Sequence, residues 1–144
     1  MLDKAIHLAT NAHHGQFDKG GKPYILHPLR VMSFLKTDDE ELQCIALLHD
    51  VVEDTDTTYV DLGAAGMSLR VIEGVQALTK QKGFDYDTYK AQVMGNRDAM
   101  QVKMADLRHN TDIRRLKGVK EKDIKRMAKY HEFYVELKAA LEIK

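Results

Sequence analysis

The sequence is organised around residues 47–55, which read LLHDVVEDT. The apolar start of this stretch is typical of the inside of a helix, and the adjacent pair His49 and Asp50 closes it. Glu53 and Asp54 follow that pair at helical spacing, which places all four polar side chains on neighbouring turns. Burying charge beside an apolar run is costly unless the charge is paired or bound to a metal. One imidazole and three carboxylates suit a divalent-metal site with acid–base chemistry, although an isolated His-Asp pair is more typical of a solvated helix end, so the rest of the chain has to decide.

The composition limits the class of protein. The chain has 144 residues, which we interpret as a single domain over 1–144 with a substantial core. Lys plus Arg equals Asp plus Glu at 22 each, so no overall field attracts nucleic acid or an anionic membrane, although a local basic pocket stays open. The only cysteine, Cys44, excludes an intramolecular disulfide and is predicted to lie in the core. Without a signal peptide or membrane span, a cytoplasmic enzyme or binding module is expected.

Helical periodicity and the scarcity of alternating β-branched runs predict an all-α fold, a bundle of about six to eight helices. Thr37 or Asp38 is predicted to cap the central helix. The helix that precedes the central helix is predicted to contain Pro28 in its first turn, a position that suits a proline. The other predicted helices begin near Leu2, Tyr59, Ser68, Tyr86 and Asp98, and a long amphipathic closing helix carries Ile124 to Leu141.

Two further segments carry candidate ligands. His27 directly precedes Pro28, which biases its backbone away from the helix and holds it at a helix entry. Lys103, Asp106 and Asn110 fall at i, i+3 and i+7, on one face of a predicted helix. Apolar neighbours indicate that the Asp106 carboxylate is half-buried and needs a partner. Taken alone, the first segment is more typical of a structural histidine than of a ligand, and the second is more typical of a solvated polar stripe.

Together, these segments place two imidazoles and two carboxylates in the order His27, His49-Asp50, Asp106. Mixed nitrogen and oxygen ligands suit an ion such as Mn²⁺ or Fe²⁺ better than a structural zinc. The remaining histidines are interpreted as structural: His7, His13, His14, His109 and His131.

This order resembles the HD superfamily of metal-dependent phosphohydrolases. Within it, the chain is similar to the hydrolase domain of RelA/SpoT-type alarmone enzymes, and its length matches the stand-alone small alarmone hydrolases. The segments that carry the resemblance are AHHGQ (12–16), GKPYILHP (21–28), HDVVEDT (49–55), GVQALTK (74–80) and VKMAD (102–106), which His109-Asn110 extends.

The resemblance implies a role for each matching residue. The implied metal ligands, with Mn²⁺ the usual ion, are His27, His49, Asp50 and Asp106. Glu53 and Asp54 match the pair that handles the attacking water. The positions that match those holding the substrate's phosphates or ribose are Lys19, Lys103 and Asn110, and Tyr130 matches a tyrosine near the nucleotide.

The implied activity is removal of pyrophosphate from the ribose 3′ position of a guanosine alarmone, ppGpp or pppGpp, as in the stringent response. One alternative keeps the chemistry and changes the substrate to an adenine alarmone (ppApp or pppApp) or to the 2′-phosphate of NADPH. Another is a catalytically silent HD module that senses a nucleotide. The presence of every ligand and both acids favours an enzyme.

One position departs from the family pattern. The first loop of the family commonly reads G-Q-x-R-K, and its arginine packs on the guanine, whereas residues 15–19 here read GQFDK. The carboxylate of Asp18 cannot supply cation–π stacking. Phe17 offers an aromatic face, although a core position is equally open to it. We therefore expect weaker recognition of guanine, with hydrolysis retained, and the sequence leaves the base preference open.

Overall fold

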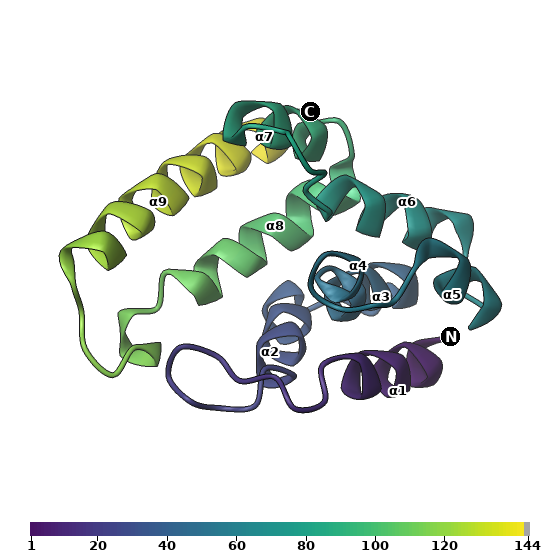
Figure 1. The fold of residues 1–144 in the computed structure, drawn as a ribbon. Coiled ribbons are helices and arrows are strands. Elements are labelled where there is room, and N and C mark those ends of the chain that lie inside the picture. Colours follow the sequence, from purple (N-terminus) through teal and green to yellow (C-terminus); the bar gives the residue numbers. More distant parts are fainter. Residues whose placement is uncertain (143–144) are drawn as a thin grey trace.

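The computed structural model describes residues 1–142, and the regular secondary structure in that range is helical apart from an isolated bridge between Phe17 and Pro23 (Figure 1). This confirms the all-α fold. The helices are α1 (Leu2–Ala12), α2 (Leu26–Leu35), α3 (Glu40–Leu48), α4 (Val51–Asp54), α5 (Tyr59–Ala64), α6 (Leu69–Leu78), α7 (Tyr86–Met94), α8 (Arg97–Asn110), the 3₁₀ turn η1 (Ile113–Arg115) and α9 (Glu121–Glu142).

Helix α3 forms the centre of the core because it is apolar on nearly every side. It packs against α1, α2, α6 and α8. A Cβ atom at Gly74 would lie 2.5 Å from the Ile45 Cδ1 atom, so the glycine allows α6 to approach α3 closely. Cys44 is fully buried, as predicted, and burial raises the pKa of its thiol to about 11. A cysteine in this environment is inert.

The start and end of α3 differ in detail from the sequence-based expectations. The N-cap is Asp39, whose Oδ1 accepts from the Leu42 N–H at 3.3 Å, so the predicted cap at Thr37 or Asp38 is wrong by one or two residues. At the other end α3 stops at Leu48, and the single turn α4 begins at Val51. Within residues 1–142 this break adds a ninth α-helix, and it places the His-Asp pair at the junction.

Helix α8 runs between α9 on one side and α2 and α3 on the other (Figure 1). Its N-cap Asn96 accepts from the Ala99 N–H at 2.9 Å. His27 is the second residue of α2, so it lies at the helix entry as expected, but the expected bias of its backbone away from the helix is wrong. The proline needs no N–H in a first turn, and His27 itself donates its N–H to the Tyr24 carbonyl at 2.9 Å. No helix within residues 1–142 has the length and apolarity to cross a membrane.

Candidate metal centre

The four predicted metal ligands converge from three parts of the fold. His27 comes from α2, His49 and Asp50 from the junction of α3 and α4, and Asp106 from α8. The Asp106 Oδ1 atom lies 2.8 Å from His27 Nε2 and 3.3 Å from His49 Nε2. Asp50 Oδ2 lies 3.0 Å from His49 Nε2 and 3.8 Å from His27 Nε2. Both imidazoles therefore direct the same ring atom toward both carboxylates.

The hydrogen bonding of His49 fits metal ligation. Its Nδ1 atom lies 2.6 Å from the Ala46 carbonyl oxygen, which can only accept, so Nδ1 carries the proton. The Nε2 atom then has a lone pair directed at the cluster, which is the usual arrangement of a ligating histidine. Ligand atoms of His27, His49 and Asp50 all lie within 4.8 Å of one another. These residues could hold one divalent ion.

The charges of the cluster also favour a cation. Burial opposes the charged form of His49, but the carboxylates of Asp50 and Asp106 outweigh it and raise the pKa of that imidazole well above its usual value. Burial likewise opposes the ionised form of Asp106, yet Lys103 and the imidazoles hold its pKa well below the usual range. A divalent ion and a proton would therefore compete for the same lone pair, that of His49 Nε2.

Lys103 and Asn110 both contact the Asp106 carboxylate. The Lys103 ammonium donates to Oδ2 at 3.0 Å, and the Asn110 amide donates to Oδ1 at 3.0 Å. The Lys103 Nζ atom also lies 5.1 Å from the centre of the Tyr89 ring. Against the effect of burial, Asp106 raises the pKa of Lys103, so the pair is ionised. The ammonium neutralises one carboxylate of the centre.

Two residues at the centre were missed by the sequence reasoning. Tyr24 donates its hydroxyl to Asp50 Oδ2 at 2.5 Å. His109 Nδ1 lies 2.7 Å from His27 Nδ1. Burial and Arg115 lower the pKa of His109 to about 4, so its neutral ring accepts a hydrogen bond from the His27 Nδ1–H group, which leaves His27 Nε2 directed at the cluster. The position of His109 three residues after Asp106, on the same face of α8, was the available signal.

Glu53 and Asp54, the predicted catalytic acids, lie on α4 directly after the ligand pair. The Glu53 Oε1 atom accepts from the Lys80 N–H at 2.6 Å, which ties α4 to the end of α6. Burial, followed by the charges of Asp50 and Glu53, raises the pKa of Asp54 to about 6. The Asp54 carbonyl oxygen accepts from Gln16 at 3.0 Å. The catalytic role of both acids stays a prediction.

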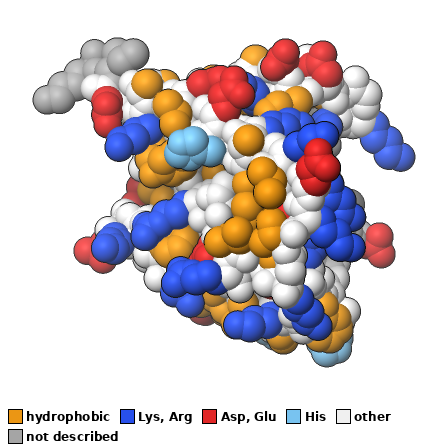
Figure 2. Space-filling view, turned by 90° about the vertical axis from the view of Figure 1, so that its left-hand side faces the viewer, with side chains coloured by type: hydrophobic (Ala, Val, Ile, Leu, Met, Phe, Trp, Pro, Cys, Tyr) orange, Lys and Arg blue, Asp and Glu red, His pale blue; other side chains and the backbone are white. Residues whose placement is uncertain are grey.

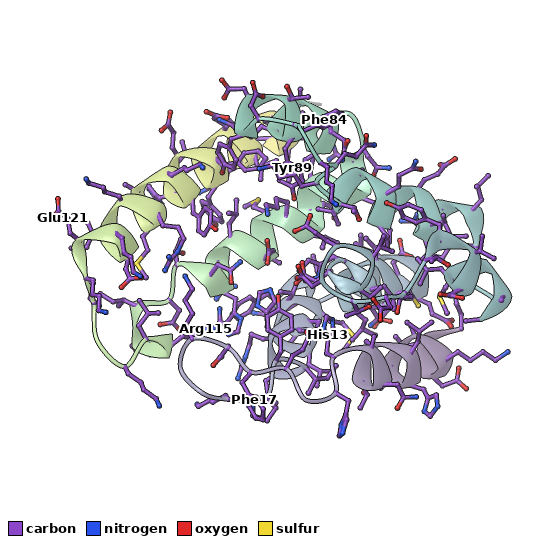
Figure 3. All side chains as sticks on the ribbon, in the orientation of Figure 1. His13, Phe17, Phe84, Tyr89, Arg115 and Glu121 are labelled. Atoms are coloured by element: carbon purple, nitrogen blue, oxygen red, sulfur yellow. The ribbon has the colours of Figure 1, made fainter. Side chains whose placement is uncertain are left out.

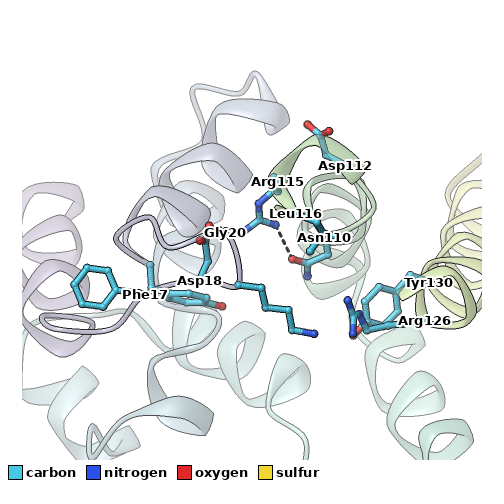
Figure 4. A pocket seen from close by; sticks show the side chains of 11 residues that line it. Phe17, Asp18, Gly20, Asn110, Asp112, Arg115, Leu116, Arg126 and Tyr130 are labelled. Carbon is cyan, nitrogen blue, oxygen red and sulfur yellow. Dashed lines mark hydrogen bonds and ion pairs between the residues drawn. The ribbon is translucent and has the colours of Figure 1, made fainter. Parts of the chain in front are cut away.

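A cavity of about 280 Å³ lies next to the centre, between the loop at residues 16–23, the end of α8, η1 and α9 (Figure 4). Its lining includes three of the predicted substrate-binding residues, Lys19, Asn110 and Tyr130, but not Lys103. Tyr24 also lines it, so the cavity reaches the groups that contact Asp50 and Asp106. The complete lining is Phe17, Asp18, Lys19, Gly20, Tyr24, Asn110, Asp112, Arg115, Leu116, Arg126 and Tyr130.

The cavity wall contains two arginines that the sequence reasoning did not select, Arg115 and Arg126. Phe17 is 66% exposed and projects outward from the loop, so it is a rim residue and not a core residue (Figure 3). On the face shown in Figure 2, Lys and Arg side chains surround a strip of hydrophobic side chains. Although the chain has no net charge, this face thus carries many cationic side chains together with some acidic ones. The cavity lining has three cations, Lys19, Arg115 and Arg126, and two carboxylates, Asp18 and Asp112.

A family model described as HD domain matches residues 5–130, and the chain belongs to this family. More particularly, it is 38% identical over 122 residues to the bifunctional (p)ppGpp synthase/hydrolase SpoT of Escherichia coli strain K12, covering 76% of this chain and 17% of the relative. A guanosine-3′,5′-bis(diphosphate) 3′-pyrophosphohydrolase of Haemophilus influenzae is 34% identical over 134 residues, covering 85% of this chain and 20% of the relative. The chain thus spans a fifth or less of the length of these relatives.

A solved structure supports the same assignment of the fold. It is reported as a metazoan ortholog of SpoT that hydrolyzes ppGpp, and it superposes with a TM-score of 0.78. The two chains are 24% identical, and the match covers 98% of this chain and 91% of the other. At this identity the likeness establishes the shared helical fold.

Proposed function

We propose that the chain hydrolyses the 3′-pyrophosphate of a guanosine alarmone, ppGpp or pppGpp. The observation that carries the proposal is the direct connection between the His27–Asp106 centre and the neighbouring cavity, through Tyr24 and Asn110. A nucleotide can place one phosphate group at the centre and its nucleoside in the cavity. The printed functions of the relatives agree with this arrangement.

The metal centre would be formed by His27, His49, Asp50 and Asp106. The ion, Mn²⁺ in our proposal, supplies Lewis-acid chemistry to the phosphate ester. Asp54 on α4 would accept a proton from the attacking water, because it lies among the carboxylates of the centre, whose charges help to raise its pKa to about 6. Glu53 would hold that water in line, with one of its oxygens anchored on the Lys80 N–H.

The nucleotide would be bound by groups around the cavity. Lys19 offers a cation to phosphate, Asn110 an amide to ribose, and Tyr130 a ring near the nucleoside. For Lys103 we propose a different role from direct substrate contact, since its ammonium is held by Asp106 and does not line the cavity. It would keep the Asp106 carboxylate ionised and oriented.

We also propose that the domain extends past the family match to the end of the chain. Phe133 and Leu137 of α9 are fully buried in the core, so the closing helix is an integral part of the fold.

A nucleotide substrate and a buried, unpaired Cys44 are consistent with a cytoplasmic enzyme.

The test is turnover of a panel of phosphorylated nucleotides in Mn²⁺, with released pyrophosphate and phosphate measured separately. We expect pyrophosphate release from ppGpp and pppGpp that EDTA abolishes. Pyrophosphate release from ppApp alone, or phosphate release from NADPH alone, would identify that nucleotide as the substrate and exclude the guanosine alarmones. Nucleotide binding without any turnover would identify a silent sensor and contradict the proposal.

A further inference from the structure

We infer that Arg115 contacts the nucleoside base, in place of the arginine that the family pattern puts at position 18, and that Asp18 holds the Arg115 guanidinium for this contact. The inference rests on the proposed function in one respect, since it takes the ligand to be a nucleotide. It assigns a base-contacting residue that the sequence pattern does not reveal.

The Arg115 guanidinium is fixed by acceptors on two sides of the cavity. Its Nη1 atom donates to the His109 carbonyl at 3.1 Å and to Asn110 Oδ1 at 3.0 Å (Figure 4). Its Nη2 atom forms an ion pair with Asp18 Oδ2 at 3.5 Å. These contacts lie along the edges of a planar group. The side chain remains 20% exposed and lines the cavity, so a face of the plane is available to a ligand.

The Asp18 carboxylate holds its own turn and the Arg115 guanidinium, and so it is not available to bind a ligand. Its Oδ1 atom accepts from the Lys22 N–H at 2.9 Å, inside a turn that the Gly21 N–H closes on the Asp18 carbonyl at 3.0 Å. Although burial acts the other way, the Lys22 N–H, the Arg115 guanidinium and the Gly20 N–H together lower the pKa of the Asp18 carboxyl group. A carboxylate that is ionised and engaged through both oxygens is suited to orienting a guanidinium.

The loop and the end of η1 also fit together through their backbones. A Cβ atom at Gly20 would lie only 2.3 Å from the Arg115 carbonyl oxygen, so this approach requires a glycine. The neighbouring Arg114 serves as a comparison, because it is an arginine without a role in the cavity. Its side chain is 87% exposed, pairs with Asp112 in its own turn, and does not line the cavity.

The order of groups along the cavity indicates which part of a nucleotide Arg115 meets. Asp106 of the metal centre accepts from Asn110, and Asn110 accepts from Arg115. Arg115 is therefore one side chain further from the centre than the residue proposed to meet ribose. In a 3′-phosphorylated nucleotide, the base lies beyond the ribose from the reacting phosphate. A guanidinium plane stacks well on a purine, which a lysine cannot imitate.

The experiment is an NMR titration of the full chain with two ligands that differ only by the base, GMP and ribose 5-phosphate. We expect Arg115→Ala to weaken GMP binding about tenfold, the scale of one cation–π contact, and to leave ribose 5-phosphate binding unchanged. Arg115→Lys should not restore GMP affinity, and the matched control Arg114→Ala should bind both ligands as the wild type does. Equal weakening for both ligands would make Arg115 a phosphate ligand and overturn the inference.

Variants at Asp18 give an independent test. Asp18→Asn should weaken GMP binding, but less than Arg115→Ala does. Asp18→Arg should weaken GMP binding too, because two guanidinium groups would then repel each other without a carboxylate between them. Stronger GMP binding by Asp18→Arg would show that position 18 alone governs base contact, and would overturn the inference. Thermal unfolding checks that each variant is folded. Because these measurements need no turnover, an inactive wild type would refute the proposed function and leave this test intact.

Discussion

The inner and outer ends of the site are built from different kinds of structure. At the inner end, α2, α3 and α8 hold His27, His49 and Asp106, whose exposure is 4% or less. At the outer end, the loop at 16–23 and η1 form the wall, and Phe17 on its rim is 66% exposed. Helices packed in a core fix geometry closely, whereas loops tolerate change and select ligands. We therefore expect inner changes to alter metal binding and kcat, and outer changes to alter KM.

The largest effect is expected from Asp106→Ala at the inner end. The substitution removes the carboxylate that faces both imidazoles and leaves the Lys103 ammonium without its partner. Activity should be abolished, and unfolding without metal should cost about 3–5 kcal/mol less than in the wild type. Urea unfolding with and without Mn²⁺ checks this, since only the wild type should gain stability from the ion. The exposed carboxylate of Asp87, changed to Ala, is the control.

Glu53→Gln separates chemistry from metal retention within the inner end. Glutamine keeps an oxygen that can accept from the Lys80 N–H, so the anchor of α4 survives while the charge is lost. We expect kcat to fall roughly a hundredfold, the scale of general acid–base catalysis, with metal content near that of the wild type. Elemental analysis of the purified protein measures the metal, and Glu73→Gln, at an exposed position of α6, is the matched control. A parallel loss of metal would place Glu53 among the ligands instead.

His109→Ala should have an intermediate effect. Without the acceptor at 2.7 Å from its Nδ1 atom, the His27 ring loses the partner that orients it. Metal affinity should fall about tenfold, as is usual when the partner of a ligating histidine is removed, and saturating Mn²⁺ should restore most of kcat. Competition with a metal chelator measures the affinity. His109→Asn retains an acceptor and should lose less, and exposed His131→Ala should lose none; unchanged affinity in His109→Ala would show that His27 needs no partner.

The smallest effect on activity is expected from Gly20→Ala at the outer end. The new methyl group must move away from the Arg115 carbonyl oxygen, because a Cβ atom cannot approach an oxygen as closely as 2.3 Å. Overpacking of this kind costs about 1–3 kcal/mol of stability. KM should rise roughly threefold, within the range of one weakened contact, at constant kcat. Gly118→Ala, where nothing lies within 4 Å, is the control; a fall in kcat for Gly20→Ala would erase the distinction between the two ends.

The same contrast explains what the sequence could predict. The inner end follows from local signals: an apolar run marks α3, and His27, His49-Asp50 and Asp106 each stand beside recognisable helix patterns. The sequence-based predictions that failed concern helix boundaries, where several local preferences compete. Asp39 outcompetes two equally suitable neighbours as the N-cap, and α2 includes His27 despite the following proline.

The outer end could not be predicted in this way. Asp18 and Arg115 are separated by 97 positions in the chain; Asp18 lies in a loop, and Arg115 ends η1, whose three residues are too few to show a periodic pattern. Periodicity reports which face of an element is buried, but it carries no information on which loops meet. Asp18 therefore shows in the sequence only as a missing arginine, while its partner becomes apparent once η1 is placed beside the loop.

The contact between His27 and Asp106 joins residues that are 79 positions apart. Closing a segment of this length costs entropy that is recovered only when the helices at its two ends have packed. We therefore expect the centre to be assembled late in folding, after α8 has docked on α2. An ion held there would stabilise the completed fold and not the transition state, so it would slow unfolding without accelerating folding. The supply of metal would then set the lifetime of the folded chain as well as its activity.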